Sequence, residues 1–324
     1  MTLARPSAAA LPAAPQPPAP GAAAPQPPVA WSCRTLNTTS VSRRGATWAQ
    51  LSCSSTPIPV FGAAGPLVVN VVSFDLATRG LALRPVAAKA GSLLPLDGLA
   101  ATSSGVVAGI NGPYFYRIDV ATFFDGVCIG KNKADALKPV AAAAPNSGIG
   151  DGAVVAGGVL LASNCDCLGY SRPAVLTINA SSTRIDVLHR GDAPPAGTAL
   201  DALSAGPNLV TSNASGTFID IPSDDDNIGN IFEHAANTAF GWAANGTAYM
   251  VTTDGFDGCP LLNASCGTNA FTLAYLMRDH FGAAFALSMD QGGSTTMWTS
   301  PGGIVSHSGG GARDIFAGLF LAEV

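Results

Sequence analysis

Glycine and proline punctuate this chain so densely that its hydrophobic residues fall into short runs separated by turns. The 324 residues include 37 glycines and 24 prolines, while 48% are hydrophobic. That apolar content is enough to bury a large core, and it excludes disorder throughout the chain. The length allows one large domain or two ordinary ones.

Several of the short apolar runs have the composition of β-strands. Residues 66–76 are rich in β-branched side chains, and residues 105–110 form an apolar run that ends at a turn. Both segments predict strands that are partly or fully buried. Further strand candidates are residues 153–161, 174–179 and 183–188.

Residues 240–250 predict a β-hairpin. Asn245 and Gly246 divide this run, and this dipeptide tolerates the positive φ of a type I′ turn. Asn245 also begins an Asn-x-Thr acceptor site for N-glycosylation. An exposed hairpin tip is a place where a glycan fits.

One segment has the pattern of a helix. Thr268 or Asn269 can cap it, apolar residues then recur at helical spacing as far as Phe281, and Gly282 ends it. Many strands and few helices predict an α+β fold built mostly on antiparallel sheet. We expect a single large domain without regular βαβ alternation.

The first 30 residues differ in composition from the rest. They are rich in alanine and proline, which predicts a disordered arm of extended polyproline II character ahead of a domain over residues 31–324. Prolines interrupt every apolar run of this arm, so no signal peptide is visible in it. No later segment offers about 18 uninterrupted apolar residues, so no transmembrane segment is expected.

Cysteines and glycosylation sites favour an oxidising compartment. The chain has seven cysteines, and Asn-x-Ser/Thr sites begin at Asn37, Asn179, Asn213, Asn245 and Asn263. Together they predict a secreted, disulfide-bonded glycoprotein of the secretory pathway. Cys259 and Cys266 flank a short turn-forming loop and are the best candidates for a disulfide, with two buried thiols as the alternative.

The charge balance bears on possible partners. The net charge is −5, and only 11% of the residues are charged. Nucleic-acid binding is not expected, because phosphate backbones require clustered cations. Chemistry in such a chain depends on backbone amides, hydroxyls and a few carboxylates.

Residues 290–296 combine these groups. Asp290 is followed by Gln291, two glycines, Ser294 and two threonines. Glycine amides and hydroxyls together can hold a phosphate or sugar oxygens without a cation. The segment lacks the lysine of a P-loop and the second glycine of a Gly-x-Ser-x-Gly elbow. A glycine-rich turn with an aspartate cap is the alternative interpretation.

A second strand end carries an amide and aromatic rings. Residues 109–116 place Asn111 and Gly112 ahead of Tyr114. Aromatic faces suit sugar rings, and an asparagine amide both donates and accepts hydrogen bonds. The four histidines are scattered without metal-ligand spacing, so we expect neither a metal nor another cofactor.

In sequence order, these motifs resemble the phosphodiester glycosidase family. The resemblance rests on residues 111–115, 204–210, 237–241, 251–255 and 286–297, with Arg313 at the position of a late family arginine. It covers roughly residues 60–324. Three family positions differ: Asn237 replaces an arginine, while Gln291 and Pro113 each replace a glycine.

The resemblance implies a hydrolase that cleaves a sugar-1-phosphodiester and releases the sugar from a phosphorylated partner. Asp290 is then the expected catalytic carboxylate, with Asp254 as the alternative candidate for that role. Residues that would hold the phosphate or the sugar are Gly292, Gly293, Ser294, Thr295 and Arg313. Those expected on the sugar side are Asn111, Tyr114 and Asn208, with Gly112 and Thr238 as further substrate-binding candidates.

Two other functions remain open at this stage. Asn237 in place of arginine removes a fixed cation that could bind phosphate. The same cleft in a secreted protein could therefore bind a glycan or glycosyl phosphate without cleaving it. A structural secreted domain whose glycine turns have no ligand is the third interpretation.

Overall fold

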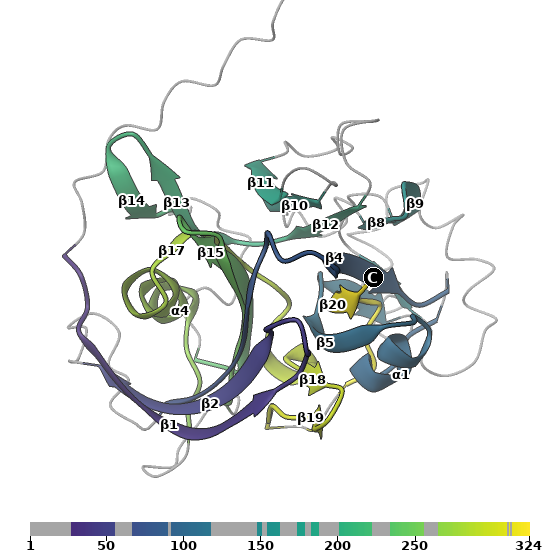
Figure 1. Cartoon of the computed structure of the whole chain (residues 1–324), viewed down its shortest axis with the longest axis horizontal. Coiled ribbons are helices and arrows are strands. Elements are labelled where there is room, and N and C mark those ends of the chain that lie inside the picture. The colour runs from purple at the N-terminus through teal and green to yellow at the C-terminus, as the bar shows by residue number, and fades with distance from the viewer. Residues whose placement is uncertain are drawn as a thin grey trace, which may run out of the picture.

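The computed structural model describes residues 27–55, 67–89, 92–117, 148–150, 154–162, 174–178, 183–187, 201–221, 234–255, 265–309, 311 and 313–324. Within these ranges β-strands predominate, and they form three larger sheets and one two-stranded pair. Figure 1 shows the largest sheet curving round helix α4. A second sheet and helix α1 lie on the side of the largest sheet that faces away from α4.

The largest sheet has eight strands, and each neighbouring pair is antiparallel. In spatial order they are β1 (Trp31–Ser40), β2 (Thr47–Ser55), β3 (Leu67–Asp75), β16 (Thr247–Thr253), β15 (Asn237–Ala243), β17 (Ala283–Ser288), β13 (Asn208–Asn213) and β14 (Gly216–Ile219).

The central strands of this sheet are buried on both faces. Phe240 and its pairing partner Met250 belong to a core on one face, while Ala239 and its partner Val251 belong to a core on the other. Successive side chains of a strand point to opposite faces. A strand with two buried faces is apolar along most of its length, which is why residues 67–72 of β3 are apolar except for Asn70.

Two five-stranded sheets complete the main architecture, and a short pair accompanies them. The second sheet runs β19 (Gly303–Ile304), β18 (Met297–Thr299), β5 (Val106–Asn111), β20 (Ala317–Glu323) and β4 (Leu81–Ala87). The third runs β11 (Thr183–Val187), β10 (Ala174–Ile178), β12 (Asp201–Ala205), β8 (Val154–Ala156) and β9 (Val159–Ala162). The pair consists of β6 (Phe115–Arg117) and β7 (Gly148–Gly150).

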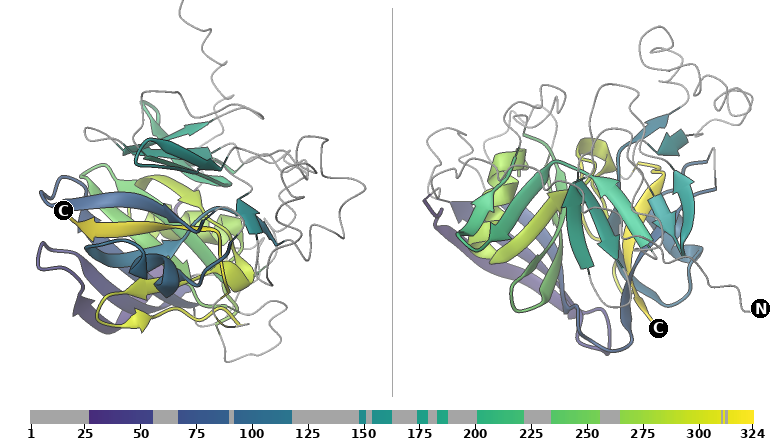
Figure 2. Two further views of the ribbon diagram at one scale, coloured as in Figure 1. Left: turned by 90° about the vertical axis from the view of Figure 1, so that its right-hand side faces the viewer. Right: turned by 90° about the horizontal axis from the view of Figure 1, so that it is seen from above.

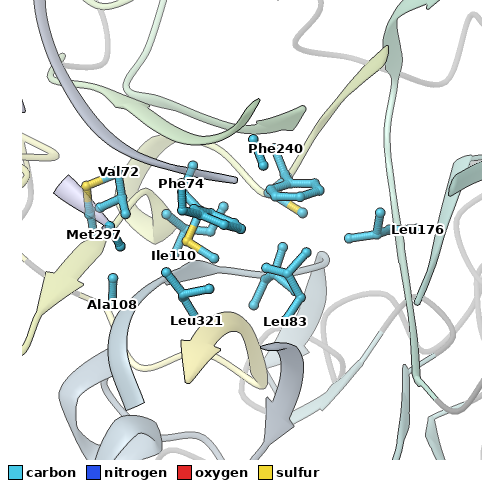
Figure 3. Packing of buried hydrophobic residues seen from close by; sticks show 14 of the residues in the cluster. Val72, Phe74, Leu83, Ala108, Ile110, Leu176, Phe240, Met297 and Leu321 are labelled. Carbon is cyan, nitrogen blue, oxygen red and sulfur yellow. The ribbon is translucent and has the colours of Figure 1, made fainter. Parts of the chain in front are cut away.

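The main core lies where the three sheets meet. Phe240 and Val72 of the largest sheet pack in one cluster with Ile110 of the second sheet and Leu176 of the third. Figure 3 shows these side chains converging from their separate strands. The two views of Figure 2 show the β10–β11–β12 region lying across one end of the other two sheets. Burial of this cluster fixes the second sheet against the first.

Helices are few in the described ranges. They are α1 (Leu96–Ala101), α4 (Ala270–Tyr275), the π-helical turn η1 (Leu276–His280) and the 3₁₀ turn η2 (Gly292–Ser294). The Asn269 side chain accepts from the Thr272 amide at 2.8 Å and so caps α4. Gly282, after the helix, has a φ of +66°. The predicted helix and its two ends are therefore confirmed.

The fold confirms the expectation of mostly antiparallel sheet with few helices. The helices cover sheet faces and edges, so a mostly-β description fits the described part of the chain more closely than the α+β label. The predicted hairpin is also confirmed as β15–β16, where residues 244–246 form the loop and Gly246 has a φ of +88°.

One predicted strand was wrong in its extent. Residues 153–161 were expected to form a single strand, but the structure has a hairpin of β8 and β9 there. Gly157 and Gly158 both take positive φ, at +58° and +77°. Two consecutive glycines in that conformation reverse the chain, and the apolar residues on either side masked this signal.

The end of the proline-rich arm contacts the helical turn η1. The Val29 amide donates to Asp279 Oδ2 at 2.8 Å, and Arg278 Nη2 donates to the Pro27 carbonyl at 3.3 Å. Residues 1–26, the rest of the predicted arm, lie outside the described residues. Among the helices that the structure describes, none is long and apolar enough to cross a membrane.

Candidate active site

The predicted site residues come from strand ends that meet at one edge of the two larger sheets. Asp254 directly follows β16, Asn111 ends β5, and Asp290 comes two residues after β17. Strand β15, which begins at Asn237, lies between β16 and β17. Segments far apart in sequence therefore bring two carboxylates to the same region of the fold.

Asn111 links the second sheet to the first. Its Nδ2 donates to the Asp290 carbonyl at 2.8 Å, and its Oδ1 accepts from Thr238 Oγ1 at 2.6 Å and from the Thr296 amide at 3.0 Å. The side chain is fully buried. These three bonds use most of the hydrogen-bonding capacity of an asparagine amide. Asn111 therefore positions the loop that carries Asp290.

The backbone holds Asp290 on both sides. Its amide donates to the Gly112 carbonyl at 3.0 Å, and its Oδ1 accepts from the Gln291 amide at 2.9 Å. Gly112 is required here, because a Cβ on it would lie 2.8 Å from the Ala317 carbonyl oxygen. The Asp290 side chain is only 8% exposed. A carboxylate held in this way has a fixed position before any ligand arrives.

Asp254 is the second buried carboxylate. Its Oδ1 accepts from Asn70 Nδ2 and from the His307 amide, each at 2.9 Å. Burial raises the pKa of this carboxyl above its ordinary value, while the His307 amide, the His307 charge and the Asn70 amide oppose the rise. No described residue bonds to its Oδ2 in the structure. One oxygen of Asp254 is thus fixed by donors from two separate segments.

The glycine-rich loop follows β17 and contains the 3₁₀ turn η2. The Gly292 amide donates to the Ala236 carbonyl at 2.8 Å, and a role for Gly292 in binding a ligand stays a prediction. The Gly293 amide has no partner among the described residues. Ser294 Oγ and Thr295 Oγ1 are buried and without a hydrogen-bond partner. Buried hydroxyls of this kind are costly unless something bonds to them.

Arg313 lies against this loop. A Cβ on Gly293 would be 2.5 Å from Arg313 Nη2 and 3.0 Å from its Cζ. The absence of a side chain at Gly293 therefore lets the guanidinium approach the loop backbone. Arg313 is exposed, so it remains accessible to an anion. The structure thus brings this predicted cation to the predicted glycine loop.

Asn208 and Tyr114 are two further residues expected on the sugar side. Asn208 Nδ2 donates to Thr211 Oγ1 at 2.7 Å and to Asp220 Oδ2 at 2.8 Å, so both bonds lie within the β13–β14 hairpin and the residue that follows it. Tyr114 is half-buried, between β5 and β6. A role in sugar binding stays a prediction for both residues.

Asn237 does not face the cluster around Asn111. Side chains alternate along β15, and the neighbouring Thr238 is the one that bonds to Asn111. The Asn237 amide donates to the carbonyls of Ala235, at 3.1 Å, and Thr268. Asn237 therefore joins the start of β15 to the segment before α4.

Two contributors to the site were missed by sequence reasoning. Asn70 is the only polar residue within the apolar run 67–72, and a lone amide in a buried strand is a signal of a buried polar contact that could have been read. His307 carries no such signal. It reaches Asp254 through its backbone, which no residue-type pattern reveals.

One cluster of possible metal-ligating side chains contains a disulfide. Among the described residues, donor atoms of Cys33, Cys53 and His280 lie within 4.8 Å of one another. The two sulfurs form a disulfide of 2.11 Å, so neither is a free thiolate ligand.

Cys266 is also disulfide-bonded. Cys259, its predicted partner, lies outside the described residues.

A mostly-β fold with two buried carboxylates, a glycine loop and a cation at one sheet edge defines a candidate hydrolase of small polar substrates. The model of the phosphodiester glycosidase family matches residues 104–321. The chain therefore belongs to the phosphodiester glycosidase family. No curated protein sequence matches it significantly.

Solved structures share the fold at low sequence identity. The catalytic domain of zebrafish N-acetylglucosamine-1-phosphodiester alpha-N-acetylglucosaminidase, in a form auto-inhibited by its pro-peptide, has a TM-score of 0.55 and 14% identity over 92% of this chain and 85% of that domain. The "Putative exported protein" of Burkholderia pseudomallei has a TM-score of 0.55 and 16% identity, over 85% of this chain and 77% of that chain. A hypothetical Synechocystis protein has a TM-score of 0.54 and 16% identity over 92% of this chain, which spans 64% of that protein.

Proposed function

We propose that this protein hydrolyses a sugar-1-phosphodiester, releasing the sugar from a phosphorylated partner. The observation that carries the proposal is the placement of two buried carboxylates, Asp290 and Asp254, at the sheet edge that also holds the glycine loop and Arg313. The match to the family model supports the same reaction class. Carbohydrate or glycosyl phosphate is then the substrate class.

The reaction follows from the chemistry of the leaving group. Water attacks the anomeric carbon, the bond from that carbon to the phosphate oxygen breaks, and its electron pair leaves with the phosphate. Because the phosphate is a stable anion, protonation of the leaving oxygen matters less than in an ordinary glycoside. The site mainly has to stabilise negative charge on phosphate and accept the proton of the attacking water.

The glycine loop and Arg313 supply the charge stabilisation. The Gly293 amide, the hydroxyls of Ser294 and Thr295, and the Arg313 guanidinium are donors without a described competing acceptor. Such donors, held in place before the reaction, stabilise developing charge without reorganisation. A guanidinium also suits the paired oxygens of a phosphate.

Asp290 is assigned as the carboxylate that takes the proton from water, and Asp254 as the second carboxylate near the anomeric carbon. The bonds from Gln291 to Asp290, and from Asn70 and His307 to Asp254, fix both side chains. Two oriented carboxylates are what the hydrolysis of a glycosyl bond uses.

The position of Asn237 favours an enzyme over a binding protein without activity. Its amide bonds to Ala235 and Thr268, on the face of β15 opposite to Thr238. The loss of an arginine at this position therefore leaves the Asn111 cluster and its cation Arg313 in place.

A secretory location accompanies this function. The Cys33–Cys53 disulfide is typical of proteins in an oxidising compartment, and one structural relative bears the name "Putative exported protein". N-glycosylation at the exposed Asn245 turn fits the same compartment.

A hydrolysis assay tests the proposal. Purified protein is given a chromogenic sugar-1-phosphodiester and, separately, the matching simple glycoside. Release of chromophore from the diester alone supports the proposal, and release from neither refutes it. Binding of the diester without release would instead assign a glycosyl-phosphate-binding protein. Asp97→Asn, on the exposed start of α1, is the control for loss of a carboxylate.

A further inference from the structure

A cavity of about 250 Å³ lies where the third sheet meets the other two. Its walls come from the end of β3, from β4 and β20, and from the neighbouring ends of β10, β11 and β12. Asp75 in this wall pairs with Thr247 at the start of β16, and Asp254 follows the far end of that strand, seven positions on. At about 3.3 Å per residue, the cavity is about 23 Å from Asp254. It is therefore separate from the candidate active site.

The floor of this cavity is apolar. It is formed by Phe74, Leu83, Ile178 and Leu321, which are all buried members of the main core. Figure 3 labels three of them, Phe74, Leu83 and Leu321. A ligand that reaches this floor removes apolar surface from water, which favours binding of a hydrocarbon group. Because pockets for drug-sized ligands measure about 300–1,000 Å³, a cavity of this size suits a smaller molecule.

Two half-buried side chains of opposite charge line the same cavity. Asp201 Oδ1 accepts from the Gly157 amide at 2.6 Å. In the part of the chain that the structure describes, no residue bonds to Asp201 Oδ2 or to the Arg84 guanidinium. Burial raises the pKa of Asp201, while the Gly157 amide and the charge of Arg84 oppose the rise. The two groups thus interact electrostatically, and both keep hydrogen-bonding capacity for a ligand.

This combination of groups defines the chemistry of a ligand. A carboxylate with a free oxygen accepts hydrogen bonds from an ammonium group, and a free guanidinium donates to a carboxylate. The half-buried hydroxyl of Thr183 adds a neutral donor or acceptor. The other acid of the wall, Asp75, is exposed, and its Oδ1 accepts from the Ala77 amide at 2.8 Å. A molecule with an ammonium, a carboxylate and a short hydrocarbon chain matches both charges and the floor.

We propose that this cavity is a second binding site of the protein and that it takes a free α-amino acid with an apolar side chain. The ammonium group bonds to Asp201, the carboxylate bonds to Arg84, and the side chain lies on the apolar floor. This site uses none of the residues assigned to hydrolysis, so the inference stands or fails independently of the proposed function.

Four small molecules test the proposal by isothermal titration calorimetry with the full chain at about pH 7, where both charges of an amino acid are present. L-leucine carries all three features, glycine lacks the hydrocarbon chain, isoamylamine lacks the carboxylate, and 4-methylpentanoate lacks the ammonium group. We expect L-leucine to bind with a Kd of about 1 mM or lower. The other three should bind at least about tenfold more weakly, because each loses one set of contacts.

Paired variants identify which charge meets which end of the ligand. Asp201→Asn should raise the Kd of L-leucine by about tenfold or more and leave that of 4-methylpentanoate unchanged. Arg84→Met should raise the Kd of L-leucine similarly and leave that of isoamylamine unchanged. The controls Asp97→Asn and Arg34→Met, at exposed positions, should bind L-leucine as the wild type does.

The wild-type protein alone can overturn the proposal, whether or not the variants fold. Absence of saturable binding of L-leucine up to about 20 mM would do so. Binding of glycine as tight as that of L-leucine would do so as well, since the apolar floor then contributes nothing. With variants whose thermal unfolding matches the wild type, an unchanged Kd of L-leucine for both Asp201→Asn and Arg84→Met would also overturn it. None of these results bears on hydrolysis of the diester.

Discussion

The side chain of Asn111 donates to the carbonyl oxygen of Asp290 at 2.8 Å, across 179 positions of the chain. This bond joins the end of a strand in the second sheet to the loop that follows a strand in the first. The expected catalytic carboxylate is therefore positioned by the packing of two sheets, and the chemistry of the site depends on their relative placement.

The first prediction concerns that link. Asn111→Ala removes one donor and one acceptor, and it leaves the Thr238 hydroxyl and the Thr296 amide unpaired in the core. We expect the free energy of unfolding to fall by about 2–4 kcal/mol. Urea denaturation measures it. Asn213→Ala, at the exposed end of β13, removes only an exposed bond from the Ser215 amide; it is the control and should lower stability by no more than about 1 kcal/mol.

The second prediction concerns Asp254 and pH. Burial raises the folded-state pKa of this carboxyl, so the folded protein holds the proton more tightly than the unfolded chain. Its favourable contribution is present below the unfolded value of 3.8 and is lost as pH rises through the folded pKa.

Asp254→Asn removes the buried charge and keeps an oxygen for the donors Asn70 and His307. At pH 7 we expect this variant to be more stable than the wild type by on the order of 1 kcal/mol, with the difference disappearing below about pH 4. Urea denaturation at the two pH values checks it. At each pH, the stability of Asp254→Asn is compared with that of the wild type. If the variant gains less stability over the wild type at pH 7 than at pH 4, burial is not the main cause of the raised pKa of Asp254.

The third prediction tests whether Gly293 acts through Arg313. A Cβ at Gly293 would lie 2.5 Å from Arg313 Nη2, so Gly293→Ala should displace the guanidinium and raise KM for the diester. Arg313→Ala should raise KM by about ten- to a hundredfold, the value of a hydrogen bond to a charged group.

A double-mutant cycle tests whether Gly293→Ala raises KM by displacing Arg313 or by an unrelated change in the loop. Once Arg313 is absent, Gly293→Ala should cost little more, because both changes remove the same contact. Gly98→Ala on α1, where the nearest contact of a Cβ would be 3.2 Å, is the glycine control. Additive effects of Gly293→Ala and Arg313→Ala on kcat/KM would show that the two residues act independently.

The fourth prediction concerns the disulfide between β1 and β2. Cys33 and Cys53 are 20 positions apart, and release of a loop of that length should cost about 3 kcal/mol of stability. Replacing both cysteines with alanine and measuring thermal unfolding checks this. The diester should still be hydrolysed below the lowered Tm, because the disulfide contributes no residue to the candidate site.

Local sequence patterns located the elements well. β-Branched composition placed β3 and β5, the asparagine at 269 and the glycine at 282 bounded α4 with η1, and Asn245-Gly246 marked a hairpin. Each of these signals acts over a few neighbouring residues. The β8–β9 hairpin was missed because apolar residues on both sides of its two glycines have the composition of one continuous strand.

Contacts between distant segments could not be predicted in the same way. β3 pairs with β16, about 180 positions away, and no local pattern fixes that order. Asn70 and His307 reach Asp254 only because of such pairings, and His307 does so through its backbone. The face on which Asn237 lies and the bond that occupies the Gly292 amide likewise depend on strand register.

The central claim is that Asp290 carries out hydrolysis of a sugar-1-phosphodiester. The most direct measurement compares chromophore release from such a diester by the wild-type protein, by Asp290→Asn and by the control Asp97→Asn, with circular dichroism to verify folding. We predict release by the wild type and the control, and a loss of at least about a thousandfold in kcat for folded Asp290→Asn. Release by Asp290→Asn at a rate close to that of the wild type would contradict the claim.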